Sequence, residues 1–542
     1  MAPKVTVLRR KLGARDIGAD GVTRLLDSVT DGAGRVRAFF GNGTAAAAFA
    51  PDTVPGMAMP EDLREISGAT LAVLRADGPC RIALATGGAV DLVPAAAEWG
   101  LFAGLNCIFG FRLEETAAQV AEGLIWHAHH HGLEGALIVN RVPGDQPHAF
   151  AGALETALIQ AGVTLTVVLL DCPLPLGKPD SGPESHPYLA PDAPGKDRMT
   201  PPAPDPWRSP LGEGLIYEIA KWRFLAQARA VLTLDVTDIL PMRAPGAASA
   251  FDLCDSARHG VILLVGRRIY PWRVRAGGDA GFGDHICQQF DGRRGMARWG
   301  VAPARAGLEN SWRMIRVAYA KPDEGAQVPF LRAMAIRVPG VQASELVPKT
   351  SLIEDADLLR MSVEGFGHKP IRPPISRPRA AAAAATQGGR TAIVTTMKNE
   401  GPFILEWLAY HRMIGVDDFL IYTNDCTDGT DTMLDLLQAK GLVAHRENPF
   451  RDSGLKPQHA ALQAAEAEPV MQECGWGICM DVDEFINIHV GDGTLAALYA
   501  AMGDANMISL TWRLFGNADV HGYADRFLLE QFDRCAPRII RK

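Results

Sequence analysis

The sequence predicts an α/β protein of two tandem domains, each built around a mostly parallel sheet. With 542 residues, the chain is too long for one ordinary domain. From residue 391 onward, β-branched apolar runs alternate with segments of helical periodicity, which is the order expected for a parallel sheet with crossover helices. The first half of the chain repeats a similar order of segments.

The composition favours a soluble, cytoplasmic protein. Hydrophobic residues make up 47% of the chain and charged residues 21%, so there is enough apolar material for cores. The net charge of −8 argues against a nucleic-acid partner, which would favour a basic face. The start of the sequence lacks the apolar core of a signal peptide. No apolar run is long enough for a membrane span, so any membrane contact would be peripheral. Nine cysteines without a CxxC pair indicate a reduced compartment.

Two Pro-rich stretches set the predicted domain boundaries. Residues 173–210 are rich in Pro, Gly, Ser and Asp, and we expect them to be a disordered insertion. Residues 369–390 combine Pro and Arg with a six-alanine run and are predicted to be an interdomain linker, in which the alanines could form a short helix. The predicted domains are therefore 1–80, of unclear fold, 81–368, which carries the insertion, and 391–542.

The C-terminal domain has the clearest pattern of strands and helices. TAIVTTM (391–397) reads as a buried strand, and FILEWLAYHRMIG (403–415) follows with helical spacing and a closing glycine. DDFLIYTN is a second strand, NDCTDGT a turn that opens the next helix, and GLVAHREN a third strand. The apolar run GWGICM then leads into DVDE at 481–484. Ligands of such sheets bind outside the carboxyl ends of the strands.

Polar, mostly acidic side chains are predicted to converge at that edge. They are Lys398, Asn399 and Glu400, then Asn424, Asp425 and Asp428, and finally Asp481, Asp483 and Glu484. Strand alternation would place Asp481 and Asp483 on one side, where two carboxylates suit Mn²⁺ or Mg²⁺ bridging a diphosphate. The alternative stays open at this point, because an isolated D-x-D is common and NDCTDGT alone is usually a simple helix entry.

The ordered set of these motifs resembles the GT-A glycosyltransferases, in the family-two-like group related to family 92. The resemblance rests on residues 391–430, on GWGICMDVDEFINI and on ISLTWRLFGN. It implies a GT-A-like, Rossmann-like domain at 391–542 that holds a nucleoside-diphosphate sugar with a metal on the D-x-D. The implied donor-binding residues are Lys398, Asn399, Glu400, Asn424, Asp425, Asp428 and Asp481. The implied acceptor-side residues are Trp512, Arg513, Phe515 and Gly516.

Two departures from the family pattern affect these expectations. Thr423 stands where relatives usually carry an Asp, so the nucleoside contacts are expected to differ. Family members continue past the stretch PRIIRK, at which this sequence ends, so we expect either a fragment, truncated at its C-terminus, or a domain without a complete active site. Glu484, Asp519 and His521 are the candidates for a catalytic base.

The first half reads as a second, degenerate copy of the same fold. EGLIWHAHHHG (122–132) parallels EWLAYHRMIG (406–415), and DVTD (235–238) parallels DVDE. Asp235 precedes Arg267 by the same number of residues as Asp481 precedes Arg513. Thr237 replaces the second carboxylate, and Asp238 would point away in a regular strand, so the metal site is expected to be lost. The alternative is that α/β domains simply look alike.

The sequence therefore favours a metal-dependent glycosyltransferase of the hexosyltransferase type, acting on a polysaccharide, glycolipid or protein acceptor. The loop MKNEG lacks the Gly-rich basic character of a nucleotidyltransferase, and DVDEF lacks the Thr of an aspartyl phosphatase. A non-catalytic scaffold or carbohydrate-binding protein of surface-polysaccharide assembly remains the second hypothesis.

Overall fold

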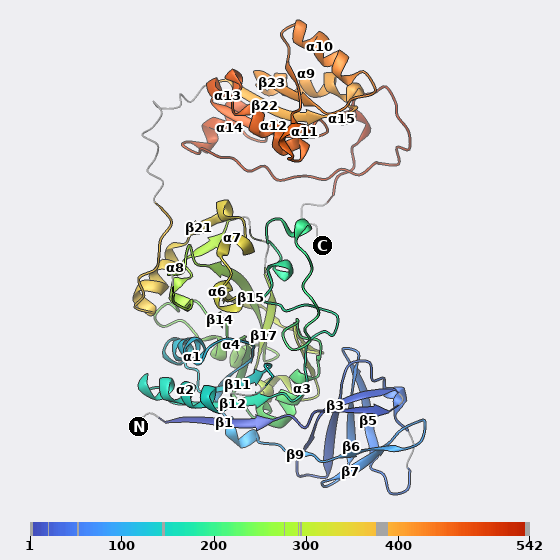
Figure 1. Ribbon diagram of the computed structural model, residues 1–542, viewed down its shortest axis with the longest axis vertical. Helices are drawn as coiled ribbons and strands as arrows, with labels where there is room; N and C mark the ends of the chain where they lie inside the picture. Colours follow the sequence, from blue (N-terminus) through green and yellow to red (C-terminus); the bar gives the residue numbers. More distant parts are fainter. Residues whose placement is uncertain are drawn as a thin grey trace. The chain divides into compact units, whose positions relative to one another are not determined.

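The computed structural model describes residues 4–536 apart from 20, 51–53, 144–146, 276, 291, 293–294 and 375–388. The chain divides into two compact units, Met1–Pro374 and Ile375–Lys542 (Figure 1). The division falls within the stretch predicted to be a linker. Most of that stretch, including its alanine run, lies outside the described residues. The two units are described separately below.

Unit 1 is built on a large mixed sheet whose first five strands are parallel (Figure 1). In sheet order the strands are β1 (Val5–Lys11), β12 (Leu165–Asp171), β11 (Gly135–Asn140), β10 (Asn106–Arg112), β13 (Ala230–Thr233), β17 (Ala297–Val301), β15 (Val261–Tyr270), β16 (Cys287–Gln289) and β21 (Leu352–Glu354). Strand β17 is antiparallel to both of its neighbours, β13 and β15. β20 (Asp323–Ala333) pairs with β15 and with the short β14 (Asp238–Ile239).

Helices cover both faces of this sheet. α1 (Ala117–His131) and α2 (Pro147–Gln160) connect the parallel strands. Thr116 and Gln119 form a capping box at the start of α1, and Gly132 ends the helix in the left-handed conformation. Ile108, Ile138 and Val167 point to one core cluster, whereas their neighbours Phe109, Leu137 and Val168 point to another. This alternation buries both faces, as parallel sheets require.

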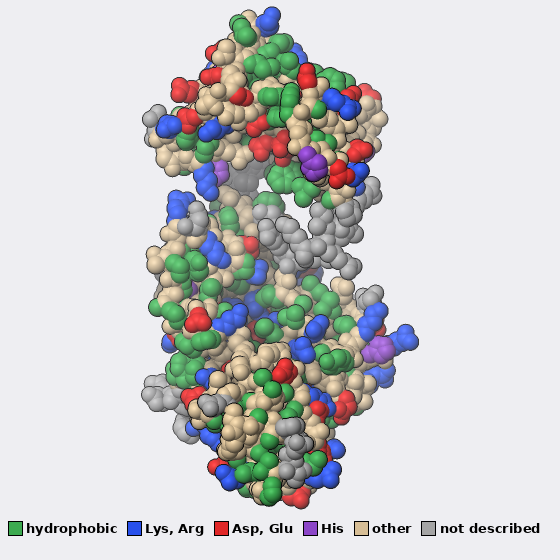
Figure 2. Space-filling view, turned by 90° about the vertical axis from the view of Figure 1, so that its right-hand side faces the viewer, with side chains coloured by type: hydrophobic (Ala, Val, Ile, Leu, Met, Phe, Trp, Pro, Cys, Tyr) green, Lys and Arg blue, Asp and Glu red, His purple; other side chains and the backbone are tan. Residues whose placement is uncertain are grey.

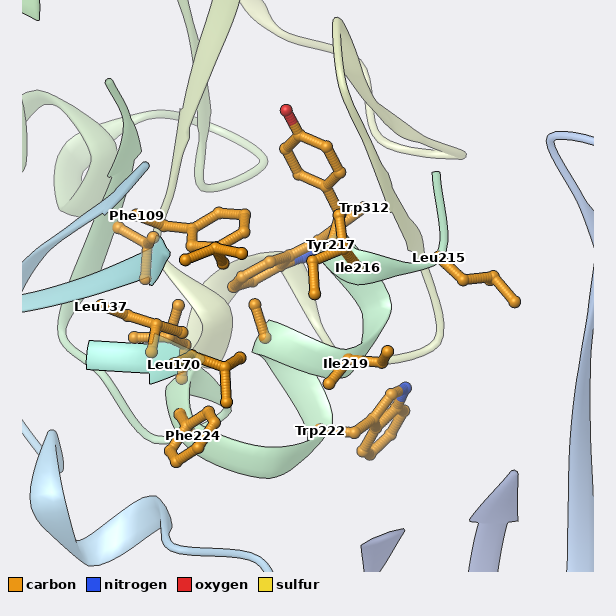
Figure 3. Packing of buried hydrophobic residues seen from close by; sticks show 14 of the residues in the cluster. Phe109, Leu137, Leu170, Leu215, Ile216, Tyr217, Ile219, Trp222, Phe224 and Trp312 are labelled. Carbon is orange, nitrogen blue, oxygen red and sulfur yellow. The ribbon is translucent and has the colours of Figure 1, made fainter. Parts of the chain in front are cut away.

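The second of these clusters centres on a short helical segment. α3 (Ile216–Ala220) runs directly into a π-helical turn, η5 (Lys221–Leu225), and every residue of both is buried. Tyr217 packs edge-on against Phe109, at 5.2 Å between ring centroids (Figure 3). The buried Lys221 ammonium is paired with Glu218 at 2.9 Å and donates to the carbonyls of Leu308 and Asn310. A buried charge is tolerated there because it is paired and hydrogen-bonded.

The first hundred residues contribute to three different sheets. β1 joins the edge of the large sheet, next to β12. The following strands form a separate antiparallel sheet with the core residues Val22, Leu25, Phe40 and Leu74. They are β2 (Arg15–Ala19), β3 (Val22–Thr30), β4 (Arg35–Phe40), β5 (Met59–Ile66) and β6 (Ala69–Arg75), with β9 (Ala95–Ala96) beside β3. The hairpin β7 (Cys80–Ala83)–β8 (Ala89–Leu92) is a two-stranded sheet of its own.

Residues 173–210, expected to be a disordered insertion, instead follow a defined path in the structure. The segment doubles back on itself, with the amide of Lys178 donating to the carbonyl of Pro210 and that of Glu184 to the carbonyl of Arg208. Leu176 and Ser209 are buried. Disorder was predicted from the Pro and Gly content alone. The large sheet offers an apolar surface, and even a Pro-rich segment can bury apolar side chains such as Leu176 there.

Unit 2 contains a smaller sheet whose four strands are all parallel. In sheet order they are β24 (Ala444–Glu447), β23 (Asp418–Thr423), β22 (Thr391–Met397) and β25 (Trp476–Cys479). The helices are α9 (Ile404–Ile414), α10 (Thr430–Ala439), α11 (Phe450–Ser453), α12 (Pro457–Ala465), α13 (Pro469–Glu473), α14 (Leu495–Met502) and α15 (Leu528–Gln531). These elements confirm the mixed α/β class and the parallel strands predicted from the alternating pattern.

The two units share one strand order. Counted along the chain from β10 and from β22, each unit places its third, second, first and fourth strands side by side and parallel: β12-β11-β10-β13 and β24-β23-β22-β25. In both units the carboxyl ends of these strands therefore meet at one edge of the sheet.

Candidate functional site

In unit 2, hydrogen bonds join the loop that follows β22 to the loop that follows β23. Asn399 adopts the left-handed conformation with φ of 59°, and its side chain donates to the Thr427 hydroxyl and accepts from the Thr427 amide. The buried hydroxyl of Thr430 accepts from the amides of Glu400 and Gly401 at 2.9 and 2.8 Å. These bonds fix the main chain at Glu400 against the turn NDCTDGT.

The D-x-D follows its strand rather than forming part of it. β25 ends at Cys479, so the predicted strand alternation of Asp481 and Asp483 is wrong in its geometry. Residues 481–484 form a turn in which the Glu484 amide donates to the Asp481 carbonyl and the Glu484 carboxylate accepts from the Asp481 amide, at 3.2 and 3.1 Å. Val482 is buried, while Asp481 and Asp483 are exposed on either side of it.

The charges around this turn are negative. The pKa of Glu400 is raised, mainly by partial burial and further by the negative charges of Asp483, Asp428 and Asp481. The carboxylates that follow the three strands are therefore close enough to Glu400 to affect its charge. Figure 2 shows acidic side chains gathered on one face of unit 2.

The Asp481 and Asp483 carboxylates offer only oxygen ligands, which suit a hard cation that takes most of its other ligands from water and substrate. Asp481 and Asp483 offer two exposed carboxylates. Within the described residues, however, no three His, Cys, Asp or Glu side chains are arranged to hold a metal ion. A protein site of one or two carboxylates completed by water and substrate phosphates is typical of Mg²⁺.

Not every predicted donor-binding residue faces the acidic group. The Asp425 carboxylate is instead paired with Arg451, at 2.8 Å between Oδ2 and the guanidinium. The side-chain oxygen of Asn424 is buried without a hydrogen-bond partner. Lys398 is exposed at the end of β22.

The predicted acceptor-side segment lies on the surface and contacts mainly itself. Trp512 and Phe515 are 75% and 57% exposed. Gly516 donates its amide to the carbonyl of Arg534, and Asp519 pairs with the Arg534 guanidinium at 2.8 Å. Arg513 contacts the sulfur of Cys535, and His521 is exposed. In the described part of the chain, no hydrogen bond or ion pair joins these residues to the D-x-D turn.

Helix α9 supports the D-x-D turn through contacts that the sequence did not reveal. The Trp407 indole donates to the carbonyl of Glu484 at 3.2 Å, and the Tyr410 hydroxyl to that of Ile486 at 2.8 Å. The Glu406 carboxylate accepts from the amides of Leu528 and Leu529 at the start of α15, at 2.6 and 3.1 Å. The only sequence signal for these roles is that side chains able to form hydrogen bonds, such as Glu406 and Tyr410, interrupt the apolar pattern of α9.

Unit 1 makes two similar contacts at the corresponding places. The Trp126 indole donates to the carbonyl of Leu240, which follows Asp235 at the same interval as Ile486 follows Asp481. The Glu122 carboxylate accepts from the amide of Phe282 at 2.9 Å, at the start of another short helix, η6 (Phe282–Asp284).

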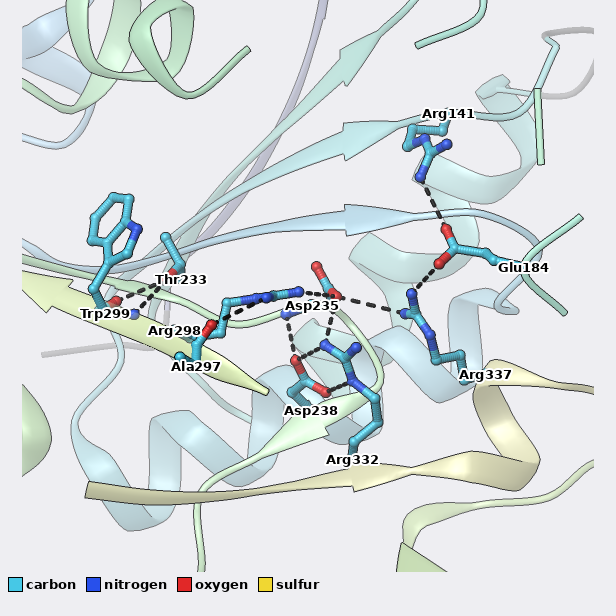
Figure 4. A network of polar contacts seen from close by, with 10 residues as sticks. All are labelled: Arg141, Glu184, Thr233, Asp235, Asp238, Ala297, Arg298, Trp299, Arg332 and Arg337. Carbon is cyan, nitrogen blue, oxygen red and sulfur yellow. Dashed lines mark hydrogen bonds and ion pairs between the residues drawn. The ribbon is translucent and has the colours of Figure 1, made fainter. Parts of the chain in front are cut away.

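In the DVTD turn of unit 1, an arginine side chain forms ion pairs with both carboxylates. The Arg332 guanidinium donates to Asp238 at 2.6 and 2.7 Å and to Asp235 at 2.7 Å (Figure 4). Asp238 does not point away from Asp235 as expected. The segment is a turn, in which the Asp238 carboxylate accepts from the Asp235 amide at 3.0 Å. Burial raises the pKa of Asp235, but the surrounding arginines outweigh it and lower the value to about 2.

In a comparison with known proteins, the family model described as glycosyltransferase family 92 matches residues 394–533, which lie in unit 2. A glycosyltransferase family 92 protein of Ricinus communis is 33% identical over 103 residues, which is 18% of this chain and 17% of the relative. Family 92 proteins of Arabidopsis thaliana and Oryza sativa are 33% and 30% identical over 97 and 100 residues, covering 17% and 18% of this chain and 16% of each relative. The chain therefore spans about a sixth of the length of these relatives.

No helix in the described residues has both the length and the apolar character needed to cross a membrane.

Proposed function

We propose that unit 2 transfers a sugar from a nucleoside-diphosphate sugar to a glycan, glycolipid or protein acceptor. The observation that carries this proposal is the acidic turn 481–484 at the carboxyl end of β25, inside the segment that resembles family 92. The parallel sheet supports it, because α/β proteins bind ligands at this edge. Asp481 and Asp483 would hold Mn²⁺ or Mg²⁺, and the cation, when bound, would neutralise the departing diphosphate.

The chain's own residues would position the donor. Asn399 and Thr430 hold the loop that presents Glu400, and this loop forms one wall of the acidic edge. A rigid loop supports catalysis because the donor loses less freedom after it binds. Glu484 shapes the turn through its bond to the Asp481 amide, which supports a positioning role rather than that of a base. Asp519 and His521 belong to the exposed segment and would reach the donor only after that segment moves.

We infer that both units derive from one GT-A-like fold, the first in degenerate form. The shared strand order supports this inference, as do the matched turns of DVTD and DVDE and the two pairs of contacts from α1 and α9. The replacement of Asp483 by Thr237, with Arg332 set against the remaining carboxylates, supports the loss of metal from the first copy. A cytoplasmic location is supported by the nine cysteines, all of them free thiols.

A calorimetric titration of UDP and GDP tests the proposed donor site. Binding that requires Mn²⁺ and is lost in Asp483→Asn is the expected result, since that substitution removes one of two protein ligands. Asp504→Asn is the matched control, because Asp504 is an exposed carboxylate of the same unit. The absence of binding to either nucleotide, with folding intact, would favour the second candidate, a non-catalytic scaffold.

A further inference from the structure

Unit 1 contains a small cavity at the carboxyl ends of its parallel strands. Its volume is about 200 Å³. Leu113 and Glu115 follow β10 in its lining, Arg141 follows β11, and Asp235 follows β13. The insertion covers one side, and Glu184 from it reaches both Arg141 and Arg337 (Figure 4). The cavity therefore occupies the edge of the sheet at which α/β proteins bind ligands.

The charge at this edge is opposite to that in unit 2. Four cationic side chains line the cavity, against the three carboxylates Glu115, Glu184 and Asp235. The cationic residues are Arg141, Lys178, Arg298 and Arg337. In unit 2 the residue that follows the second strand is the neutral Asn424, whereas in unit 1 it is Arg141. A cavity with this excess of positive charge suits an anion.

Several hydrogen-bond donors around the cavity are not used by the protein. The Arg298 guanidinium makes only long contacts, 3.3 Å to the carbonyl of Ala297 and 3.5 Å to Asp235. The Nε of Arg141 is buried without a partner, in a residue that is 3% exposed. The hydroxyl of Tyr217 makes no hydrogen bond within the described residues. Burial raises the pKa of Tyr217, so this hydroxyl stays protonated and can donate.

We propose that this cavity binds a phosphate group, either free phosphate or pyrophosphate or the phosphate end of a larger molecule, without a metal ion. Guanidinium groups match phosphate oxygens in charge and in the geometry of their paired N–H donors. Arg332 bonds both Asp235 and Asp238 and does not line the cavity, so it offsets one of the two negative charges of the DVTD turn without using a cavity arginine. Pockets for drug-sized ligands measure about 300–1,000 Å³, so a smaller cavity favours a compact anion.

Titration of the whole chain in EDTA tests this site. Inorganic phosphate, pyrophosphate and UDP are added separately, and binding is followed by calorimetry. Saturable binding of at least one probe is expected, weakened at least tenfold by Arg298→Gln. Arg258→Gln is the matched control because Arg258 is an exposed arginine of the same unit. Tyr217→Phe, which removes only a hydroxyl, provides a second variant if Arg298→Gln does not fold.

The outcomes separate the sources of phosphate and the two units. Tighter binding of UDP than of pyrophosphate would assign the cavity to the end of a nucleotide, and the reverse order would assign it to a free anion. Binding in EDTA should be unchanged in Asp483→Asn, because the inference rests on unit 1 alone and does not depend on the function proposed for unit 2. No binding of any probe in EDTA, or binding that neither Arg298→Gln nor Tyr217→Phe weakens, would overturn the proposal.

Discussion

The hydroxyl of Tyr410 donates a 2.8 Å hydrogen bond to the main-chain carbonyl of Ile486. This bond joins the face of α9 to the chain just after the D-x-D turn, and Trp126 makes the equivalent bond to Leu240 in unit 1. In both units, a side chain of the helix therefore donates a hydrogen bond to the main chain after the turn, although the donor is Tyr410 in unit 2 and Trp126 in unit 1. The support of the turn is retained even in unit 1, where Thr237 stands in place of Asp483.

Tyr410→Phe should lower the free energy of unfolding of unit 2 by about 1 kcal/mol, because the carbonyl of Ile486 loses its donor. Urea unfolding measures this change, and Tyr523→Phe is the control, since Tyr523 is 70% exposed. A loss equal to that of the control would mean that the bond does not contribute to stability. We also expect Mn²⁺-dependent nucleotide binding to weaken a few-fold in Tyr410→Phe.

Glu406→Ala should release the segment around α15 from the rest of unit 2. The carboxylate is the acceptor for two main-chain amides, and its removal should cost about 1–3 kcal/mol locally. Hydrogen exchange at Leu528 and Leu529 should become faster, while exchange in β22 should not change. Unaltered exchange at both amides would contradict the assigned role of Glu406.

The sequence predicted the elements of unit 2 well because their signals are local. TAIVTTM and FILEWLAYHRMIG carry their own periodicity, and they form β22 and α9 with ends within a residue of those expected. The expectation that the acidic residues after these strands share one edge of the sheet came from the rule that the carboxyl ends of parallel strands meet there. The geometry of the D-x-D did not follow, because a four-residue turn and a strand can share the same alternating pattern.

The arginine network of unit 1 could not be predicted, because its partners are distant in the sequence. Arg332 lies on β20 and meets Asp235 and Asp238 only after the sheet has formed. Glu184 comes from a stretch whose composition suggested disorder. Contacts of this kind depend on the tertiary fold, and no local pattern of residues in the sequence predicts them.

The stability of unit 1 should fall in acid through Asp235. Its pKa is lowered from 3.8 to about 2 in the folded state, because the charges of the arginines outweigh the effect of burial. The stabilisation is therefore complete above pH 4 and is lost as the pH falls towards 2, by about 2 kcal/mol. Unfolding by urea between pH 4.5 and 2 measures it, and Asp235→Asn should show a smaller dependence on pH.

His127 should make unit 1 sensitive to milder acid. Burial lowers its pKa from 6.5 to about 4, although the bond to the Gly123 carbonyl opposes this shift. The unfolded chain takes up a proton near pH 6.5 and the folded chain does not, so stability falls between pH 6.5 and 4, by up to about 3 kcal/mol. His131 and His285 are buried and shifted in the same direction. Urea unfolding of His127→Gln should therefore show a reduced slope, and an unchanged slope would contradict the assignment.

The central claim is metal-dependent sugar transfer at the D-x-D turn of unit 2. The most direct test measures the release of UDP or GDP from a panel of nucleotide sugars, with Mn²⁺ or EDTA, in the whole chain. We expect release with Mn²⁺, none in EDTA, and a loss of at least a hundredfold in Asp481→Asn and in Asp483→Asn but not in Asp504→Asn. Equal release in EDTA, or release that both site variants retain, would contradict the assignment of the turn.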